Sequence, residues 1–448
     1  MTVSLADLTA QLLDVARAAG AEAADAIAVD GTSVSIAVRQ GALEQAERSE
    51  GIDIGLRVLI GRRQACVSSS DTRPETLRQM AERAVAMARE APEDPTAGLA
   101  EPGQITKRTD TEALDLYDPS DEPDPAVLED DARRCEAAAL AVKGVTRIDG
   151  ASAGYGRRRV HIAATNGFSA GFGRSDRARG CVAIAGEGTG MERDWDFDSR
   201  VFQSDLRDAD EIGRIAGERA VARLGARRPK TGAYPVIFDE RVASSLIGHL
   251  LQAANGMMIA RGSSWLLGRM DSQVLPKGLS VIEDPHRARV PGSRLFDAEG
   301  LPTARREIVA DGILRSWTLD LATGRKLGLP STGNAARGTG GPPSPSTSNI
   351  ALTEGTSSRD DLIAQMGTGL LITQMIGSTI NPNTGDYSRG ASGFWVENGQ
   401  IAYPVNECTV AGNLLEFLPR ITPANDARHH LGTVVPSLLV EGLTLAGD

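Results

Sequence analysis

One histidine of this sequence lies in a setting that could support metal chemistry. His249 belongs to the stretch VASSLIGHLLQAANG (242–256), whose apolar spacing is typical of a buried helix. A zinc site on one helix usually needs a second ligand one turn away and a carboxylate that acts as general base. The residues one turn before His249 are Ser245 and Leu246, which supply neither. The local pattern therefore predicts a histidine packed in a helix core, without a metal ion.

The nucleophilic candidates have no activating neighbours in the sequence. The four cysteines, Cys66, Cys135, Cys181 and Cys408, are far apart and form no CxxC pair, so neither a disulfide framework nor a zinc knuckle is expected. Cys408 lies in the strand-like run NECTVAG, where no base or helix N-terminus would lower its pKa. The sequence has no P-loop. A stand-alone hydrolase that uses Cys408, or a distant histidine with Asp386, remains an alternative.

One short polar run could bind a peptide. Residues 384–390, TGDYSRG, combine two charges, an aromatic ring and flexible glycines directly before a strand-like segment. Asp386, Tyr387 and Arg389 are the candidate peptide-binding residues, because an extended peptide could add a strand at this place. The alternative is a structural loop that is closed by a salt bridge between Asp386 and Arg389.

The composition limits the possible classes of protein. At 448 residues the chain is too long for one ordinary core, so two domains are expected. A formal net charge of −11 argues against direct binding of nucleic acid, which needs a basic surface. The N-terminus lacks the basic start of a signal peptide, and no window approaches 18 uninterrupted apolar residues. We therefore expect a cytoplasmic protein without a membrane association.

The first part of the chain, residues 1–225, is predicted to form an α+β domain with a possible internal duplication. The turn-like RQG at 39–41 has a counterpart in TNG at 165–167, and ERAVA at 82–86 recurs at 218–222. Helical apolar spacing extends over residues 5–19, 74–90 and 125–142. These marks suggest that one unit of strands and helices occurs twice.

The second part, residues 226–448, is predicted to be mainly β and barrel-like. Short apolar runs bounded by glycine and proline replace the long helical patterns, and one buried helix is expected at 241–254. The Asp-Gly of VADGIL and the Asn-Gly of VENGQI indicate two hairpins. The segment 332–349, rich in Gly, Pro and Ser, is expected to be a mobile loop.

Three long stretches resemble the TldD/PmbA family, most closely its PmbA branch, which is also called TldE. They are VIFDERVASSLIGHLLQAANG, EIVADGILRSWTLDLATGRKLGLPSTGNA and TGDYSRGASGFWVENGQIAYPVNECTVAGNL. The resemblance implies one of two related subunits of a cytoplasmic peptidase that acts on short or unfolded peptides. In that family the TldD-type subunit binds zinc through an HExxxH helix and a cysteine near its C-terminus. The family is also labelled a modulator of DNA gyrase, and the acidic charge favours an indirect effect.

The resemblance can be transferred position by position. Aligned on the shared Gly-His, the two histidines of HExxxH fall on Ser244 and His249, the glutamate on Ser245, and the cysteine near Leu431. It therefore implies no catalytic residue and no metal or other cofactor in this chain, with zinc in a TldD-type partner. The expected role is a subunit that shapes the substrate chamber within a heterodimer, with a homodimer as the fallback. A stand-alone hydrolase, or a binding protein for peptides or gyrase, is the alternative.

Overall fold

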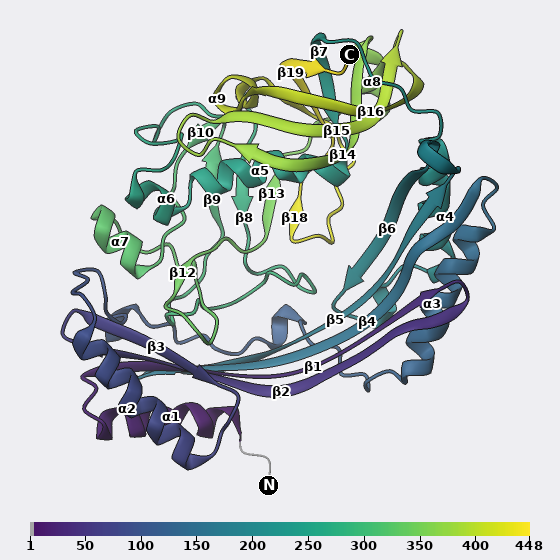
Figure 1. Ribbon diagram of the computed structural model, residues 1–448. Helices are drawn as coiled ribbons and strands as arrows, with labels where there is room; N and C mark the ends of the chain where they lie inside the picture. The colour runs from purple at the N-terminus through teal and green to yellow at the C-terminus, as the bar shows by residue number, and fades with distance from the viewer. Residues whose placement is uncertain (1–3) are drawn as a thin grey trace.

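The N-terminal half consists of two copies of one α-β-β-β-α unit that share a single antiparallel sheet (Figure 1). This computed structural model describes residues 4–448, apart from the side chains of Ser378 and Thr379. The first unit contains α1 (Leu5–Ala18), β1 (Ala23–Arg39), β2 (Ala42–Ile60), β3 (Arg63–Ser69) and α2 (Pro74–Glu90). The second contains α3 (Pro125–Leu140), β4 (Val145–Ala164), β5 (Ser169–Ala185), β6 (Glu192–Arg200) and α4 (Ala209–Ala222). Short 3₁₀ helices lie at η1 (Pro102–Gln104), η2 (Glu112–Leu114), η3 (Gly188–Gly190) and η4 (Gln203–Asp205).

The predicted internal duplication is confirmed by this topology. The strand order β3-β2-β1-β4-β5-β6 is mirrored about the antiparallel central pair of β1 and β4. Residues 39–41 lie at the turn between β1 and β2, and residues 165–167 lie at the equivalent turn between β4 and β5. The repeated ERAVA lies in α2 and again in α4. The two turns and the two copies of ERAVA therefore occupy equivalent elements of the two units.

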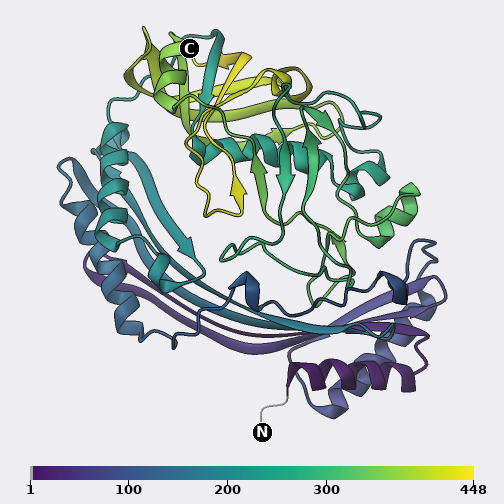
Figure 2. The same cartoon turned by 180° about the vertical axis from the view of Figure 1, so that it is seen from behind.

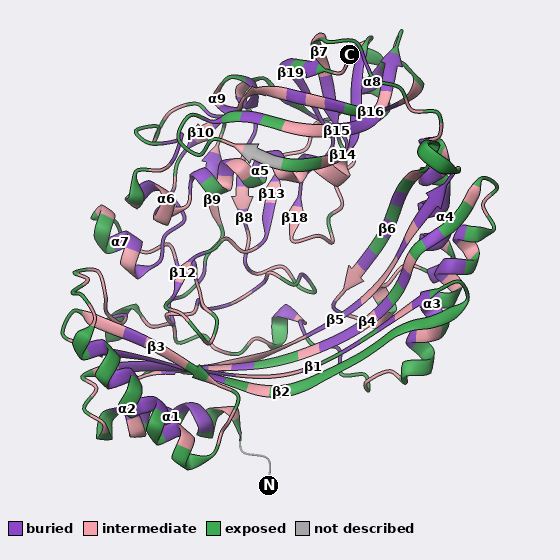
Figure 3. Ribbon diagram, in the orientation of Figure 1, coloured by how far each residue is buried: buried purple, intermediate pink, exposed green. Residues whose placement is uncertain are grey.

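The six-stranded sheet is strongly curved, and its helices cover only the convex face (Figures 1 and 2). Side chains alternate along β1, so that Ala26 and Ala28 pack with α1 and α2, whereas Ile27 packs with Leu295 and Phe296 of the C-terminal domain. The first half of β2, residues 42–51, is exposed, whereas most of its second half is buried (Figure 3). The concave face is therefore turned toward the C-terminal domain.

The C-terminal domain is built around a closed five-stranded barrel, as the barrel-like prediction required. Its barrel strands are β7 (Gly232–Phe238), β14 (Gly369–Ile380), β15 (Asp386–Glu397), β16 (Gln400–Asn413) and β19 (Leu438–Ala446), with β17 (Thr422–Pro423) at the edge. The order β16-β15-β14-β7-β19 is closed by pairing of β16 with β19. A second sheet contains β8 (Val281–Glu283), β9 (Arg306–Ala310), β10 (Ile313–Leu314), β13 (Ile350–Leu352) and β18 (Thr433–Val434). The α+β class and the barrel-like C-terminal domain are confirmed.

The helices of this domain are short. They are α5 (Glu240–Ala253), α6 (Gly256–Arg261), α7 (Leu321–Leu327), α8 (Arg359–Met366), α9 (Leu414–Phe417) and the 3₁₀ helix η5 (Leu418–Arg420). Both predicted hairpin turns are present, at Asp311-Gly312 between β9 and β10 and at Asn398-Gly399 between β15 and β16. Within residues 4–448, no helix combines the length and the apolar character needed to span a bilayer.

The segment 332–349 is anchored, and its prediction as a mobile loop is wrong. Its strands β11 (Ala335–Ala336) and β12 (Ser344–Pro345) pair with each other, and the segment reaches the N-terminal sheet. The side chain of Arg337 is fully enclosed and forms an ion pair with Asp25 of β1. Asp25 also accepts a hydrogen bond from Arg57, at 2.6 Å. The composition of the segment suggests mobility, but the buried charge of Arg337, paired with Asp25 of the N-terminal domain, holds the segment in place.

Candidate functional site

Helix α5 positions the only histidine of the degenerate motif. Its N-cap is Asp239, whose carboxylate accepts a hydrogen bond from the Arg241 backbone N–H at 3.2 Å. Leu246 and Leu250 of α5 are fully buried in the core of the barrel domain. His249 lies next to this buried stripe, so its ring reaches the edge of the core and not its centre.

His249 lines a pocket, a feature that the sequence did not predict. The ring is half-buried and stands edge-to-face to Tyr387, with 5.9 Å between the ring centroids. Its Nε2 atom is sealed from solvent and has no hydrogen-bond partner within the described part of the chain. The pocket has a volume of about 260 Å³ and is lined further by Gln252, Ala253, Met258, Ser263, Trp265, Ile380 and Pro382. Burial and the nearby charge of Arg389 lower the pKa of His249, which favours a neutral imidazole.

Replacing His249 by leucine is expected to leave folding intact. At pH 7.5 the free energy of unfolding should change by less than about 1 kcal/mol, because an apolar side chain replaces a ring with an unpartnered buried nitrogen. Because the pKa of His249 is lower in the folded than in the unfolded protein, the neutral ring contributes to stability above the unfolded pKa of 6.5. This contribution is lost as the pH falls through the folded pKa. Urea unfolding at pH 7.5 and 5.5 should therefore show that His249→Leu loses less stability on acidification than the parent. A loss above about 2 kcal/mol at pH 7.5 would contradict this account.

The other positions of the motif do not assemble a metal site. Ser245 is half-buried and its hydroxyl donates to the Val242 carbonyl at 2.7 Å, and Ser244 is half-buried one position earlier. Leu431 lies between β17 and β18, where its carbonyl accepts a hydrogen bond from Arg287 at 3.1 Å. Across residues 4–448, no three His, Cys, Asp or Glu side chains gather so that they could hold a metal ion. Two hydroxyls, a leucine and one imidazole do not make up the ligand set of zinc.

The peptide-binding candidates occupy different environments on β15. Tyr387 is 2% exposed, packs against Phe417 and donates to the Met375 sulfur, so its side chain belongs to the core. Asp386 is exposed and is held by hydrogen bonds from Thr384 and Asn413. These bonds lower the pKa of Asp386.

The salt bridge proposed as the structural alternative for this run is not formed in the described structure. Arg389 instead donates through Nε to the Gly377 carbonyl of β14 at 2.7 Å. Residues three apart on a strand point to opposite faces, which keeps Asp386 and Arg389 apart. Peptide binding by this run stays a prediction.

Cys408 is not prepared for nucleophilic chemistry. Its thiol is buried in the barrel core and donates to the Ala391 carbonyl at 3.2 Å. Burial raises the pKa of Cys408 to about 11, so the thiolate fraction near neutral pH is very small. A hydrolase mechanism through this residue is therefore disfavoured.

The sequence also missed most of the pocket wall beside His249. Met258 follows α5 directly in α6, Trp265 comes a few residues later, and Ile380 is contributed by β14 more than 100 residues away. A tryptophan and a methionine close behind a buried helix were a usable signal for an apolar wall. The contribution of β14 depends on barrel closure and has no signature in the local sequence.

Comparison with known proteins gives matches along most of the chain. Three family models match: PmbA/TldA metallopeptidase domain 1 over residues 24–88, the central domain over 118–224, and the C-terminal domain over 231–447. Metalloprotease PmbA of Escherichia coli O157:H7 is 35% identical over 418 residues, which are 93% of this chain and 90% of that protein.

Solved structures share the whole fold. A protein of Bacteroides thetaiotaomicron that is named as a modulator of DNA gyrase is 25% identical, has a TM-score of 0.91 and covers 98% of both chains. TldE from Thermococcus kodakarensis is 19% identical with a TM-score of 0.84, and the match covers 98% of this chain and 100% of that one. At the latter identity the likeness shows the fold alone.

Proposed function

This chain belongs to the PmbA/TldD metallopeptidase family, and on that premise we propose that it is the subunit without metal chemistry in a two-subunit peptidase. Its partner is a TldD-type metallopeptidase that carries zinc and the general base. This chain supplies walls of the chamber in which short or unfolded peptides are held. The proposed site of action is the cytoplasm, and the proposed assembly is a heterodimer.

The observation that carries this proposal is the donor set on α5. The family resemblance places an imidazole and a carboxylate at two positions where this chain has the hydroxyls of Ser244 and Ser245. It places a thiolate near the position where this chain has Leu431. His249 alone keeps its side-chain type, and it lines a pocket with apolar walls. Loss of the ligands together with retention of the fold and of a pocket supports a role in binding peptides and not in cleaving them. Two subunits of one ancestral fold can associate through equivalent surfaces, which supports a pseudo-twofold pair.

The proposal predicts that cleavage requires both subunits. This chain alone should cleave no peptide, and the TldD-type subunit alone should be weak. Titrating this chain into a fixed amount of the TldD-type subunit should raise the rate of hydrolysis of an extended fluorogenic peptide until it reaches a plateau near an equimolar ratio. A chelator should abolish the activity of the mixture, because the proposed nucleophile is a water molecule bound to the zinc ion of the TldD-type subunit.

Two controls make this test decisive. Serum albumin in place of this chain should leave the rate of the TldD-type subunit unchanged. Cleavage by this chain alone that survives chelation would overturn the proposal in favour of an independent hydrolase. Tight peptide binding by this chain with no effect on the TldD-type subunit would favour a binding protein that acts alone, the second alternative.

A further inference from the structure

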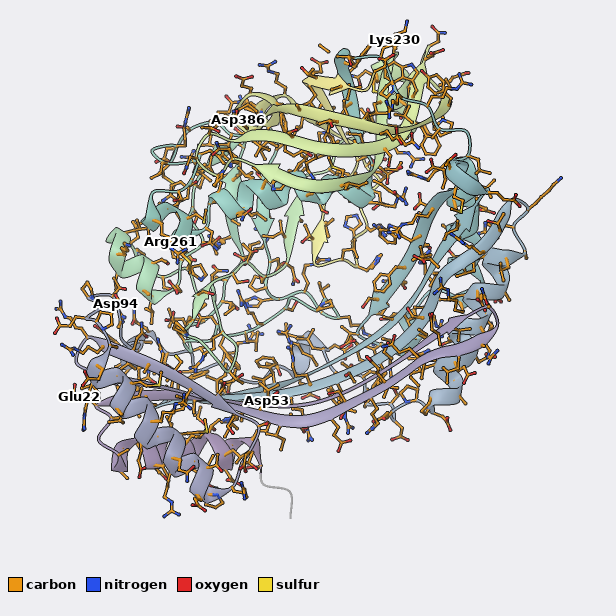
Figure 4. All side chains as sticks on the ribbon, in the orientation of Figure 1. Glu22, Asp53, Asp94, Lys230, Arg261 and Asp386 are labelled. Carbon is orange, nitrogen blue, oxygen red and sulfur yellow. The ribbon has the colours of Figure 1, made fainter. Side chains whose placement is uncertain are left out.

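A cavity of about 630 Å³ lies over the concave face of the N-terminal sheet, where that face is turned toward the C-terminal domain. Its floor includes three glycines of neighbouring strands, Gly31, Gly51 and Gly156. Asp53, which also lines it, lies at the middle of the sheet, whereas Asp386 lies on the barrel across from it (Figure 4). The volume falls within the range of about 300–1,000 Å³ that is usual for ligand pockets. The cavity is separate from the pocket beside His249.

Two arginines in this cavity face each other across adjacent strands. Arg158 of β4 is directly paired with Arg174 of β5, and both side chains line the cavity. Like charges that stand directly opposite each other destabilise a sheet. Other arginines of these strands have acidic partners: Arg159 pairs with Asp30 at 2.7 Å, and Arg179 with Asp131 at 2.7 Å. Within residues 4–448, no carboxylate oxygen lies within salt-bridge distance of Arg158 or Arg174.

Arg174 is fixed in place but not neutralised. Its guanidinium donates to the carbonyls of Pro291 and Ser293, the latter at 2.7 Å, and its Nε atom is buried without a hydrogen-bond partner in the described structure. Burial and the charges of Arg158 and Arg294 lower the pKa of Arg174 to about 10, so the group still carries its charge at neutral pH. The fold therefore holds two arginines side by side in a cavity without an ion pair to either in the described structure, while the carboxylate of Asp176 is near enough to interact with the exposed Arg158 electrostatically.

We propose that Arg158 and Arg174 form an anion site that holds the carboxylate of an acidic side chain of a bound peptide. This inference rests on the proposed function, since it names the kind of peptide that the chamber prefers. The guanidinium group of an arginine presents a planar fork of N–H donors that matches the two oxygens of a carboxylate, and Arg174 adds a second positive charge beside that of Arg158. The open space above Gly31 and Gly51 leaves room for the main chain of an extended peptide to lie on the sheet, whereas Gly156 is covered by the Asp176 carboxylate.

The acidic residues of the same cavity favour a carboxylate over inorganic phosphate. Asp53 lines the far part of the cavity, and Asp176 is paired with Gly156, two residues along the ladder from Arg158. Their charges repel a dianion more strongly than a single carboxylate. A free phosphate would also leave most of the 630 Å³ unfilled.

The test uses the full chain without a partner subunit. The probes are two fluorescein-labelled peptides with blocked C-termini, Gly-Ser-Gly-Glu-Gly-Ser and the same peptide with Gln in place of Glu, followed by fluorescence anisotropy at low ionic strength. The Glu peptide should bind about fivefold to tenfold more tightly, which is the effect of a charge-assisted hydrogen bond discounted for solvent access. Arg158→Gln should remove this preference. Arg78→Gln, which changes an exposed arginine on α2, should leave it intact.

Stability gives a second readout for the same variant. Arg158→Gln should keep or slightly raise the melting temperature, because it relieves the like charge opposite Arg174. A fall in melting temperature would show that Arg158 is needed for the fold, and would count against the proposal. Equal binding of the Glu and Gln peptides, or no binding of either at millimolar concentration, would overturn it. Displacement of the Glu peptide by micromolar inorganic phosphate would also overturn it, in favour of a free-anion site.

The outcome is distinguishable from failure of the proposed function. A preference for the Glu peptide would establish the anion site even if mixing with a TldD-type subunit produced no hydrolysis. Restored hydrolysis without a preference for Glu would remove only the anion site.

Discussion

Arg241→Met should lower the free energy of unfolding by about 3 kcal/mol, because it leaves a buried carboxylate without its principal partner. Arg241, in the first turn of α5, donates to Asp194 of β6 at 2.9 Å across the domain junction. The two side chains are only 7% and 2% exposed. After the substitution Asp194 keeps a hydrogen bond from the Trp195 backbone N–H at 2.8 Å, but its remaining ion-pair partner is the more distant Arg223, at 3.9 Å. The measurement is urea unfolding followed by tryptophan fluorescence.

Two further variants identify the cause of this loss. Arg214→Met removes an exposed pair with Glu218 on α4 and should cost less than about 1 kcal/mol. Adding Asp194→Asn to Arg241→Met should recover part of the loss, because the unpaired charge is then gone. If Arg241→Met costs no more than Arg214→Met, the junction does not depend on this ion pair.

Glu299→Gln should stabilise the protein in alkaline solution. Burial, together with the charges of Asp297 and Asp320, raises the pKa of Glu299 to about 8. Its carboxyl group also accepts a hydrogen bond from the Leu321 backbone N–H at 2.9 Å, which an amide oxygen can replace. The surroundings of residue 299 therefore favour a neutral side chain, whereas the native Glu299 becomes an anion as the pH rises.

The sign of the pH effect follows from the raised pKa. The contribution of Glu299 to stability is fully present below the unfolded value of 4.5 and is lost as the pH rises through about 8. Urea unfolding from pH 5 to pH 9 should show a shallower decline for Glu299→Gln, with a gain of roughly 2 kcal/mol at pH 9. Glu307→Gln, at an exposed position of β9, is the matched control and should follow the parent. Identical slopes for all three proteins would refute the assignment.

Much of the architecture could be predicted because its signals are local. The turns at 39–41 and 165–167 and the repeated ERAVA mark the duplicated unit in the sequence itself. The Asp-Gly and Asn-Gly pairs located two hairpins, since few other residues adopt the positive φ angles of such turns. Helix α2 begins at Pro74, as expected for a proline in the first turn.

The features that could not be predicted depend on contacts between distant residues. The composition of segment 332–349 predicts mobility because it contains no information about Asp25, the ion-pair partner of Arg337 that lies more than 300 positions earlier in the chain. The spacing of Asp386 and Arg389 suggests a salt bridge, but both residues lie on a strand, where side chains three apart point to opposite faces. Arg158 and Arg174 are unremarkable in the sequence, and only the strand register sets them opposite each other.

Closure of the barrel also affects how the chain can fold during synthesis. Phe238 of β7 pairs with Leu438 of β19, so the two strands are 200 residues apart in the chain. The N-terminal sheet is complete by Arg200 and can form on the ribosome, whereas β7 leaves the exit tunnel long before its neighbour exists. Until β19 arrives, the apolar run Val236–Phe238 has an open edge of the kind that chaperones shield from aggregation. A ribosome that stalls before residue 438 would thus release a folded first domain attached to an unfinished barrel, which is a natural target for proteolytic quality control.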